Sequence, residues 1–510
     1  MFLKLLMMAA FLVVTVYIGF YARKHARDVG GFVLGGRKVG AWFTAFAYGT
    51  SYFSAVVFIG YAGQFGWKYG LAALWIGLGN AFVGSLLAWY VLGARTRAMT
   101  HHLHAQTMPE FFGARFQSRG LRIAAAAIIF VFLVPYTASV YNGLSRLFDM
   151  AFHVPYAWCV IGMATLTCLY VVLGGYMATV INDMVQGVIM LIGIVAVILA
   201  VLGEYGGFSA ALVSLSQIPD DTPGATGQLQ GAFISLFGPD PLALAGVLVL
   251  TSLGAWGLPQ MVQKFYAIKS SDAIKRGAII STLFALVVAG GSYFLGGFGR
   301  LAAAKVAYTP KGTPVYDSVI PALLASTPDL LIGLTVVLVL SASMSTLSSL
   351  VLTSSSTLTL DFLKDNLLRD MSNKAQLRVM RLLIVVFVLI STVIALMQYN
   401  SPTTFIAQLM AISWGALAGA FLAPFLYGLY WQRTTTASVW LSFAFALALT
   451  CSNMLWNYLS PITAGALAML AGLVIVPLAS FLTPRPDAAA TQKLFTDAYR
   501  NLHDEPIDAA

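Results

Sequence analysis

The chain has 510 residues, of which 59% are hydrophobic and only 9% are charged, and its mean hydropathy is +0.83. About a quarter of the residues are charged in soluble globular domains, so this composition excludes that class and indicates a polytopic membrane protein. The net charge of +10 does not predict nucleic-acid binding, because the basic residues are spread over short connections between apolar segments rather than gathered on one domain.

Apolar stretches long enough to cross a ~30 Å hydrocarbon core recur along nearly the whole sequence, and they predict an all-α fold. Basic residues follow the first stretch and no small-residue cleavage site ends it, so we interpret it as an anchored helix rather than a signal peptide. Thirteen transmembrane helices are expected, at about 2 to 21, 41 to 66, 69 to 94, 123 to 148, 154 to 173, 176 to 203, 241 to 266, 277 to 299, 328 to 358, 382 to 398, 404 to 430, 437 to 457 and 463 to 482.

The charges of the connections predict the orientation of the chain. Connections 22–40 and 95–122 are rich in arginine and lysine, whereas the long connection 204–240 has four acidic residues and neither lysine nor arginine. By the positive-inside rule, the N-terminus lies outside and the C-terminus lies in the cytoplasm, as expected for a multi-pass protein of a bacterial plasma (inner) membrane. Connections 267–276 and 359–381 agree, and 300–327, with three basic residues, is a mild exception.

Two of the expected helices contain breaks. The second helix reads AYGTSYFSA at its middle, and the seventh contains GAWGLPQ. These helices lie five spans apart, and glycine or proline interruptions in corresponding spans are typical of transporters built from inverted repeats. The expected units are the first helix with its cytoplasmic loop (1–40), repeat one (41–203), an extracellular loop (204–240), repeat two (241–430), two C-terminal helices (431–482) and a cytoplasmic tail (483–510). The tail segment 493–502 is expected to form either an amphipathic surface helix or an ordered extension.

A stretch rich in hydroxyl groups, SASMSTLSS, begins at Ser341 inside the ninth expected helix. On a helix, Ala342 shares a face with Ser345 and Thr346, so one backbone carbonyl and two hydroxyls point towards a common spot. A monovalent cation favours such oxygen ligands, and an unwound segment around Thr50 supplies further carbonyls. The alternative is that these small residues only allow close helix packing. The second broken helix favours the ion site.

Asp183 is the one acidic residue that we place well inside an apolar span. An ionisable residue there costs at least ~2.5 kcal/mol on insertion scales, so it is a candidate functional residue by default. The alternative is that Asn182 and Asp183 lie at the membrane interface and contact water. The sequence contains no Walker motif, nucleophile elbow or HExxH motif, so neither ATP-driven pumping nor an enzymatic activity is expected.

Four segments carry a resemblance to a known family: LGGRKVGAWFTAFAYGTSYFSA, GGYMATVINDMVQG, GLPQMVQKFYAIKSSDAIKRG and SASMSTLSSLVLTSSSTLTLDF. They resemble signatures of the sodium:solute symporter family, which includes bacterial proline, pantothenate, monocarboxylate and sialic acid transporters. The resemblance covers essentially the whole chain. It implies a five-plus-five inverted-repeat core of the leucine-transporter type and solute transport driven by the sodium gradient.

The resemblance also implies roles for individual residues. Asp183 matches an aspartate that contributes to a second sodium site or to the sodium path in some members, and Tyr136 matches a tyrosine on the solute side. The sodium ligands it implies are the backbone carbonyls of Thr50, Phe53 and Ala342 and the hydroxyls of Ser345 and Thr346.

The chain departs from the proline transporters at the first break, where Tyr52 replaces an aspartate that many members have, and at Thr251 and Ala255, where those transporters have aromatic residues. The segments NDMVQGVIMLIG and YAIKSSDAIKRG resemble most the pantothenate and monocarboxylate branch. A small organic anion or an amino acid is therefore the expected solute. The candidate solute-binding residues lie at the two breaks and at the matching tyrosine: Ser51, Tyr52, Ser54, Tyr136, Ala255, Gly257 and Pro259.

The leading hypothesis is thus a sodium-coupled symporter that imports a small organic solute by alternating access, with the co-transported sodium ion as the only expected metal. A proton-coupled carrier of the same fold that uses Asp183, or a passive channel, are the alternatives. The expected partners are the solute and the lipid bilayer. Neither nucleic acid nor an obligatory protein partner is expected.

Overall fold

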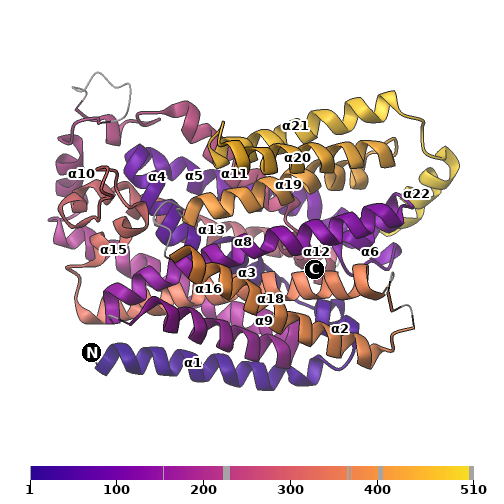
Figure 1. Cartoon of the computed structure of the whole chain (residues 1–510), viewed down its shortest axis with the longest axis horizontal. Coiled ribbons are helices and arrows are strands. Elements are labelled where there is room, and N and C mark those ends of the chain that lie inside the picture. The colour runs from indigo at the N-terminus through magenta and orange to yellow at the C-terminus, as the bar shows by residue number, and fades with distance from the viewer. Residues whose placement is uncertain are drawn as a thin grey trace.

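A computed structural model describes residues 2–152, 154–221, 230–364, 367–368, 370–399 and 406–504. Within these residues the chain is helical, apart from turns and two isolated β-bridges. The long helices run side by side along the longest axis of the molecule (Figure 1). This arrangement confirms the expected all-α membrane architecture, in which helices satisfy every backbone polar group internally.

The membrane helices and half-helices follow in chain order: α1 (Phe2–Ala22), α3 (Ala41–Tyr52), α4 (Ala62–Tyr69), α5 (Leu74–Gly79), α8 (Arg119–Phe152), α9 (Tyr156–Glu204), α11 (Pro241–Gly257), α12 (Pro259–Ala267), α13 (Ser271–Ala285), α14 (Gly291–Gly297), α16 (Asp329–Thr357), α18 (Asn373–Tyr399), α19 (Ile406–Tyr430), α20 (Thr436–Trp456) and α21 (Pro461–Leu482). Shorter helices lie in connections and in the tail: α2 (Val29–Leu34), α6 (Ala94–His102), α7 (Met108–Arg115), α10 (Phe208–Ser216), α15 (Val319–Leu324) and α22 (Ala488–Asp504).

The number of spans depends on how two long helical stretches are divided. By length and composition, the described residues contain 10 helices able to cross a membrane, or 11 when the bent pair α11 and α12 counts as one span. Two of the 10, Val56–His102 and Tyr156–Glu204, have 47 and 49 residues, about twice the ~20 that one crossing needs. Gly70 and Gly175 interrupt them with φ angles of +59° and +54°. Division at these glycines reconciles the count with the thirteen helices expected from the sequence.

The two breaks expected from the sequence are present. α3 ends at Tyr52, and Phe53 has the non-helical angles φ −103° and ψ 82°. Helical structure then resumes with a π-helix at Val56–Tyr61, whose first N–H bonds to the Ser54 hydroxyl at 3.2 Å. α11 and α12 meet at 44°. Leu258 between them is extended, because the following Pro259 disfavours a helical conformation in the residue before it.

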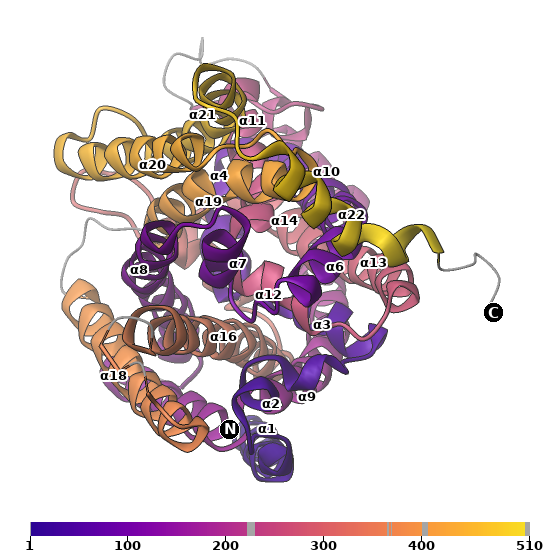
Figure 2. The same cartoon turned by 90° about the vertical axis from the view of Figure 1, so that its right-hand side faces the viewer.

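The end-on view shows α3, α12 and α16 in the middle of the bundle and α1, α18, α20 and α21 around it (Figure 2). α16 is buried without interruption from Thr335 to Thr357, although many of these residues are Ser or Thr. A polar helix at the centre of a membrane bundle is costly unless its hydroxyls have partners or a function. The buried hydroxyl groups of α16 therefore mark this helix as the candidate centre of the functional site.

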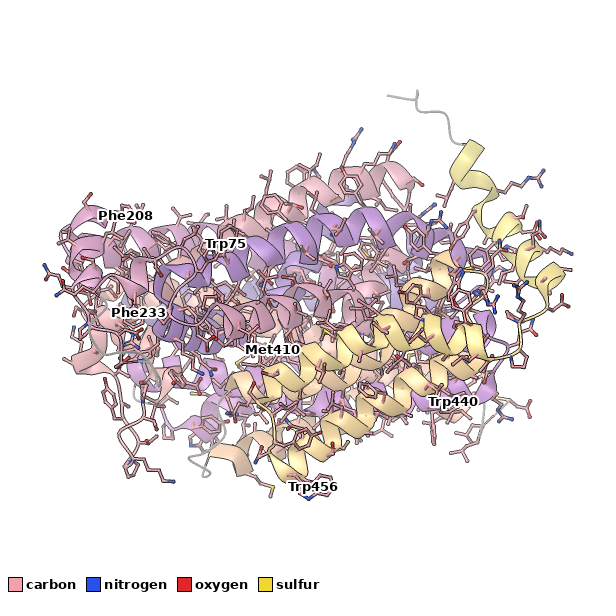
Figure 3. The ribbon with its side chains drawn as sticks, turned by 90° about the horizontal axis from the view of Figure 1, so that it is seen from above. Trp75, Phe208, Phe233, Met410, Trp440 and Trp456 are labelled. Carbon is pink, nitrogen blue, oxygen red and sulfur yellow. The ribbon has the colours of Figure 1, made fainter. Side chains whose placement is uncertain are left out.

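Aromatic residues mark the membrane-facing surface of α20. Trp440 and Trp456 are exposed and lie at opposite ends of this helix (Figure 3). At 1.5 Å per residue they are about 24 Å apart, close to the thickness of the hydrocarbon core. Tryptophan favours the membrane interface, so these two residues are placed to anchor α20 at both surfaces.

Close backbone contact between α4 and α14 leads to the first testable prediction. A Cβ atom at Gly66 would lie 2.0 Å from the Gly296 carbonyl oxygen, so Gly66→Ala forces one backbone away from the other. We expect it to destabilise the protein by about 1–3 kcal/mol, measured as a lower Tm in detergent. The matched control is Gly162→Ala in α9, where an added Cβ meets nothing within 4 Å. Equal Tm values for the two variants would contradict the prediction.

Candidate functional site

Four oxygen atoms from α3 and α16 gather at the centre of the molecule. The Ser345 hydroxyl lies 3.1 Å from the Thr50 carbonyl oxygen and 3.2 Å from that of Ala342. The Thr346 hydroxyl lies 3.3 Å and 3.1 Å from the same two oxygens. We call these four residues, together with Phe53 at the break, the oxygen cage. Its four bonded members come from segments nearly 300 positions apart in the sequence.

Local sequence explains the oxygen cage. Thr50 lies in the last turn of α3, where carbonyl groups have no N–H partner from their own helix. The spacing of three and four residues places Ser345 and Thr346 on the same face of α16 as Ala342. In the structure both hydroxyls donate to the carbonyls. Each hydroxyl also carries two lone pairs, so rotation of its O–H turns it into a cation ligand.

The surroundings of the oxygen cage suit a desolvated ion. Thr50, Ser345 and Thr346 are fully buried, and Ala342 and Phe53 are nearly so. Among the described residues no group of three or more His, Cys, Asp or Glu residues is placed to hold a metal. Neutral hydroxyl and carbonyl oxygens suit a hard cation rather than a soft transition metal.

Two buried residues of opposite charge lie beside the oxygen cage. Asp183 on α9 is fully buried, and Lys264 on α12 is 1% exposed. The two side chains interact electrostatically, and the Asp183 carboxylate also lies within reach of the Thr50 hydroxyl. The Lys264 ammonium donates a hydrogen bond of 3.0 Å to the Ser349 hydroxyl. The carboxylate predicted from the sequence therefore interacts with a buried lysine that our sequence reasoning missed.

Lys264 is connected to the oxygen cage through α3 and α16. Ser349 follows Ser345 by one helical turn, and its hydroxyl is 2.8 Å from that of Ser51, the neighbour of Thr50. A signal for Lys264 was present in the sequence, because it lies within the expected span 241–266. The rule that singled out Asp183 applies equally to an internal lysine.

An aromatic cluster covers the opposite side of the first break. The Tyr52 ring stacks on Phe53 at 4.5 Å and on Trp414 at 6.1 Å, and Tyr136 meets Trp414 edge to face at 6.0 Å. The Tyr52 hydroxyl donates to the Thr251 carbonyl at 2.5 Å. The buried Tyr136 hydroxyl lies within reach of the Ser54 hydroxyl and of the Trp414 indole N–H. Trp414 had no distinguishing feature in the sequence, since tryptophan is common in membrane helices.

The other candidate solute residues have different surroundings. Ser51 faces α16 through Ser349, and Ser54 caps the π-helix that follows the break. A Cβ atom at Gly257 would lie 2.8 Å from the Ala418 Cα, so this glycine allows α11 to pack against α19. Ala255 is buried in α11, and Pro259 is the first residue of α12.

The space beside the oxygen cage is small in this structure. Beside the oxygen cage lies a void of about 10 Å³, lined in part by Phe53, Ser54 and Ala342. This volume holds about one water molecule and no organic solute. A solute can therefore occupy this void only after the surrounding helices move.

Ion pairs join segments at both ends of the bundle. At the end where α6, α7 and α22 lie, the Arg122 guanidinium bonds to Asp361 at 2.7 Å and to Glu110 at 2.8 Å. At the other end, Arg300 bonds to Asp221 at 2.7 Å, and this hydrogen bond holds the pKa of the Asp221 carboxyl below its ordinary value. Both contacts join segments distant in sequence, so both must be considered in any opening movement.

Comparison with known sequences identifies the family to which the chain belongs. Residues 32–442 match the sodium:solute symporter family. The chain is similar to the osmoregulated proline transporter of Bacillus subtilis, with 27% identity over 501 residues, 95% of this chain and 96% of that protein. It is also similar to the sodium/pantothenate symporter of Escherichia coli, with 30% identity over 446 residues, 84% of this chain and 86% of that protein. Sodium/proline symporter 2 of Staphylococcus saprophyticus is 29% identical over 438 residues, 84% of this chain and 81% of that protein.

Solved structures share the fold. A Na+-coupled sialic acid symporter in a substrate-bound, outward-open state matches with a TM-score of 0.76 at 16% identity, over 95% of this chain and 98% of that one. A nucleobase-cation-symport-1 family transporter in a closed conformation matches with a TM-score of 0.50 at 15% identity, over 91% of this chain and 97% of that one. At such identities the likeness establishes the fold alone, and this fold is the leucine-transporter type expected from the sequence.

Proposed function

The chain belongs to the sodium:solute symporter family, and we propose that its oxygen cage binds the sodium ion that drives uptake of a small organic solute. It is a multi-pass membrane transporter rather than an enzyme. The single observation that carries the proposal is that two hydroxyls from α16 lie within 3.3 Å of a carbonyl of α3. The proposed ligands are the carbonyl oxygens of Thr50, Phe53 and Ala342 and the hydroxyl oxygens of Ser345 and Thr346.

Sodium binding at this place fixes α3 relative to α16. Without the ion, the Ser345 and Thr346 hydroxyls donate to the two carbonyls. With the ion, the same hydroxyls rotate and accept, and the positive charge replaces two hydrogen bonds by ion–oxygen contacts that are stronger in a buried site. The ion therefore stabilises the arrangement in which the first break and α16 lie together.

Transport then follows from reciprocal coupling between ion and solute. If sodium stabilises the conformation that binds solute, the solute must tighten sodium binding by the same factor. Release requires α3 and α16 to separate, which opens the oxygen cage and disturbs the aromatic cluster at the same break. Ion and solute consequently leave together.

The aromatic cluster is the proposed solute contact. Its support is that the Tyr136 hydroxyl and the Trp414 indole N–H lie close together in a buried position beside the first break, so that a solute oxygen placed between them accepts from both donors. A small organic anion, such as pantothenate or a monocarboxylate, or an amino acid supplies carboxylate oxygens for both. The similarity to sodium/pantothenate and proline transporters is consistent with this class.

Asp183 is proposed to lie on the sodium path or in a second cation site. Its buried carboxylate interacts electrostatically with Lys264 and lies near the Thr50 hydroxyl, so a cation in the oxygen cage experiences both charges. The same burial supports a second candidate function, a proton-coupled carrier in which Asp183 is the titrating group. Uptake measured with choline in place of sodium at fixed pH separates the two.

The identity of the solute is tested by thermal shift of the purified protein. Pantothenate, short monocarboxylates, proline, other amino acids and sugars are each added in sodium and in choline. We expect one class to raise Tm in sodium only, by the equivalent of about 2.7 kcal/mol at a concentration 100 times the Kd. A solute that stabilises equally in both salts would contradict coupling, and accumulation that never exceeds the external concentration would indicate a passive channel.

Orientation and internal repeats belong to the same proposal. The N-terminus is proposed to face outward and the C-terminus the cytoplasm, because the connections at the α6 and α7 end carry most of the arginine and lysine. Residues 41–203 and 241–430 are proposed as the two inverted repeats, each of which begins with a broken helix. Labelling of single cysteines placed in 204–240 and in 267–276 from opposite sides of the membrane tests the orientation.

A further inference from the structure

A basic pocket lies between the end of α1 and the beginning of α18, outside the transport site. Its volume is about 760 Å³, and aromatic or apolar side chains at Phe20, Tyr21 and Leu377 form part of its wall. Both helices lie at the periphery of the bundle, on the same side of the end-on view (Figure 2). Six cationic side chains line this basic pocket: Arg23, Lys24, Arg27, Lys374, Arg378 and Arg381.

The cationic side chains form two matched faces. Lys374, Arg378 and Arg381 are spaced by four and three residues, so they share one face of α18. The other three follow one another closely where α1 passes into a 3-10 turn at Arg23–His25. Two sequence-distant segments thus direct positive charge into one cavity.

No carboxylate neutralises these charges in the part of the chain that the structure describes. The ion pairs there involve other residues, and the nearby Asp28 side chain caps α2 by accepting from the Gly31 N–H. Arg381 donates to the Ala26 carbonyl at 3.4 Å, but its Nε is buried without a partner. Six like charges around one cavity repel each other, so an anionic ligand would stabilise the arrangement.

An apolar surface continues from the basic pocket along both helices. Tyr17 and Phe20 of α1 are exposed, as are Leu382, Val385 and Leu389 of α18, which begin beside the cationic side chains and continue along both helices. Exposed apolar side chains on a membrane helix face acyl chains. A ligand that fits both surfaces has a negatively charged head and a long apolar tail.

We propose that the basic pocket binds the phosphate headgroup of an anionic phospholipid whose acyl chains lie along α1 and α18. Arginine is well suited to this role because its planar guanidinium donates two parallel hydrogen bonds to phosphate oxygens. The proposal commits to a lipid rather than a free phosphate because of the apolar surface below the pocket. It does not depend on the assignment of the oxygen cage.

The test uses the full-length protein, delipidated in mild detergent and titrated with phosphatidylglycerol, phosphatidylcholine or inorganic phosphate. Binding is measured by native mass spectrometry and by the shift in Tm. We expect phosphatidylglycerol to bind and stabilise far more than phosphatidylcholine. The variant Arg23→Gln/Lys374→Gln/Arg378→Gln should weaken phosphatidylglycerol binding at least about tenfold, because each cation near a lipid headgroup contributes substantially.

The matched control removes the same charge elsewhere. Lys269→Gln/Lys275→Gln/Arg276→Gln alters three exposed cations, one between α12 and α13 and two at the beginning of α13, and should leave phosphatidylglycerol binding within about twofold. The charge-conserving variant Arg23→Lys/Arg378→Lys should retain most of the binding. If the triple variant fails to fold, Arg378→Gln alone, with an expected weakening of several-fold, gives the same comparison.

Three outcomes would overturn the proposal. Equal weakening in the pocket and control variants would indicate diffuse attraction to the whole basic end. Equal binding of phosphatidylcholine would show that the negative charge is irrelevant. Stabilisation by inorganic phosphate equal to that by phosphatidylglycerol would identify a phosphate site without a lipid.

Discussion

Uptake driven by a sodium gradient is expected to be lost in the double variant Ser345→Ala/Thr346→Ala. Each substitution removes one ligand oxygen from the oxygen cage, and a hydrogen bond or contact to a charge is typically worth 1.5–3 kcal/mol. The sodium affinity should therefore fall roughly tenfold or more for each single variant and beyond the usable range for the double variant. The measurement is sodium-dependent solute uptake into proteoliposomes, with sodium binding followed by the shift in Tm.

The control for this prediction is Ser343→Ala on the same helix. The Ser343 hydroxyl is equally buried, but it bonds at 2.7 Å to the Val339 carbonyl of its own helix and takes no part in the oxygen cage. This variant should retain uptake and sodium affinity. Undiminished sodium-driven uptake in the double variant would show that sodium binds elsewhere.

Removal of Lys264 is expected to make the stability of the protein strongly dependent on sodium. In Lys264→Met the Asp183 carboxylate loses the buried cation that faces it, and sodium becomes the cation available to compensate it. In choline the variant should be destabilised by about 3–5 kcal/mol, as is usual when one partner of a buried charge pair is removed. Replacing choline by sodium should raise Tm more in this variant than in the unaltered protein.

A double-mutant cycle separates this electrostatic effect from simple misfolding. Asp183→Asn leaves the Lys264 ammonium uncompensated and should also lower Tm, whereas Asp183→Asn/Lys264→Met should be more stable than the sum of the single effects predicts. Ser349→Ala is the matched control, because it removes the hydrogen bond of Lys264 and keeps both charges. Strictly additive losses would mean that the two buried residues do not act on each other.

These experiments also separate the roles of the buried groups. Loss of uptake in the Ser345 and Thr346 variants with unchanged behaviour of the Lys264 variants assigns coupling to the oxygen cage alone. A sodium-dependent Tm in Lys264→Met, together with an intact oxygen cage, assigns a second cation position near Asp183. The two results bear on different proposals, and either can fail without the other.

The sequence by itself determined the fold class and the part of the oxygen cage that α16 contributes. The length of an apolar stretch indicates a membrane-spanning helix directly, because lipid offers no hydrogen-bond partners to backbone groups that lie outside a helix. The spacing of Ala342, Ser345 and Thr346 placed them on one face, because helical periodicity is local. The breaks at Tyr52 and before Pro259 were readable for the same reason, since glycine and proline act on their own backbone.

Only the tertiary structure decided which distant residues contact those helix faces. The approach of the Thr50 carbonyl to Ser345, the electrostatic interaction of Lys264 with Asp183 and the contacts of Trp414 with Tyr52 and Tyr136 join helices that are remote in sequence. The sequence of the tail was compatible with an amphipathic surface helix or an ordered extension. In the structure α22 packs against the bundle, where the Tyr499 hydroxyl donates a hydrogen bond of 2.7 Å to the Leu429 carbonyl. Such contacts depend on how distant surfaces pack, and a local pattern of residues carries no information about its eventual partner.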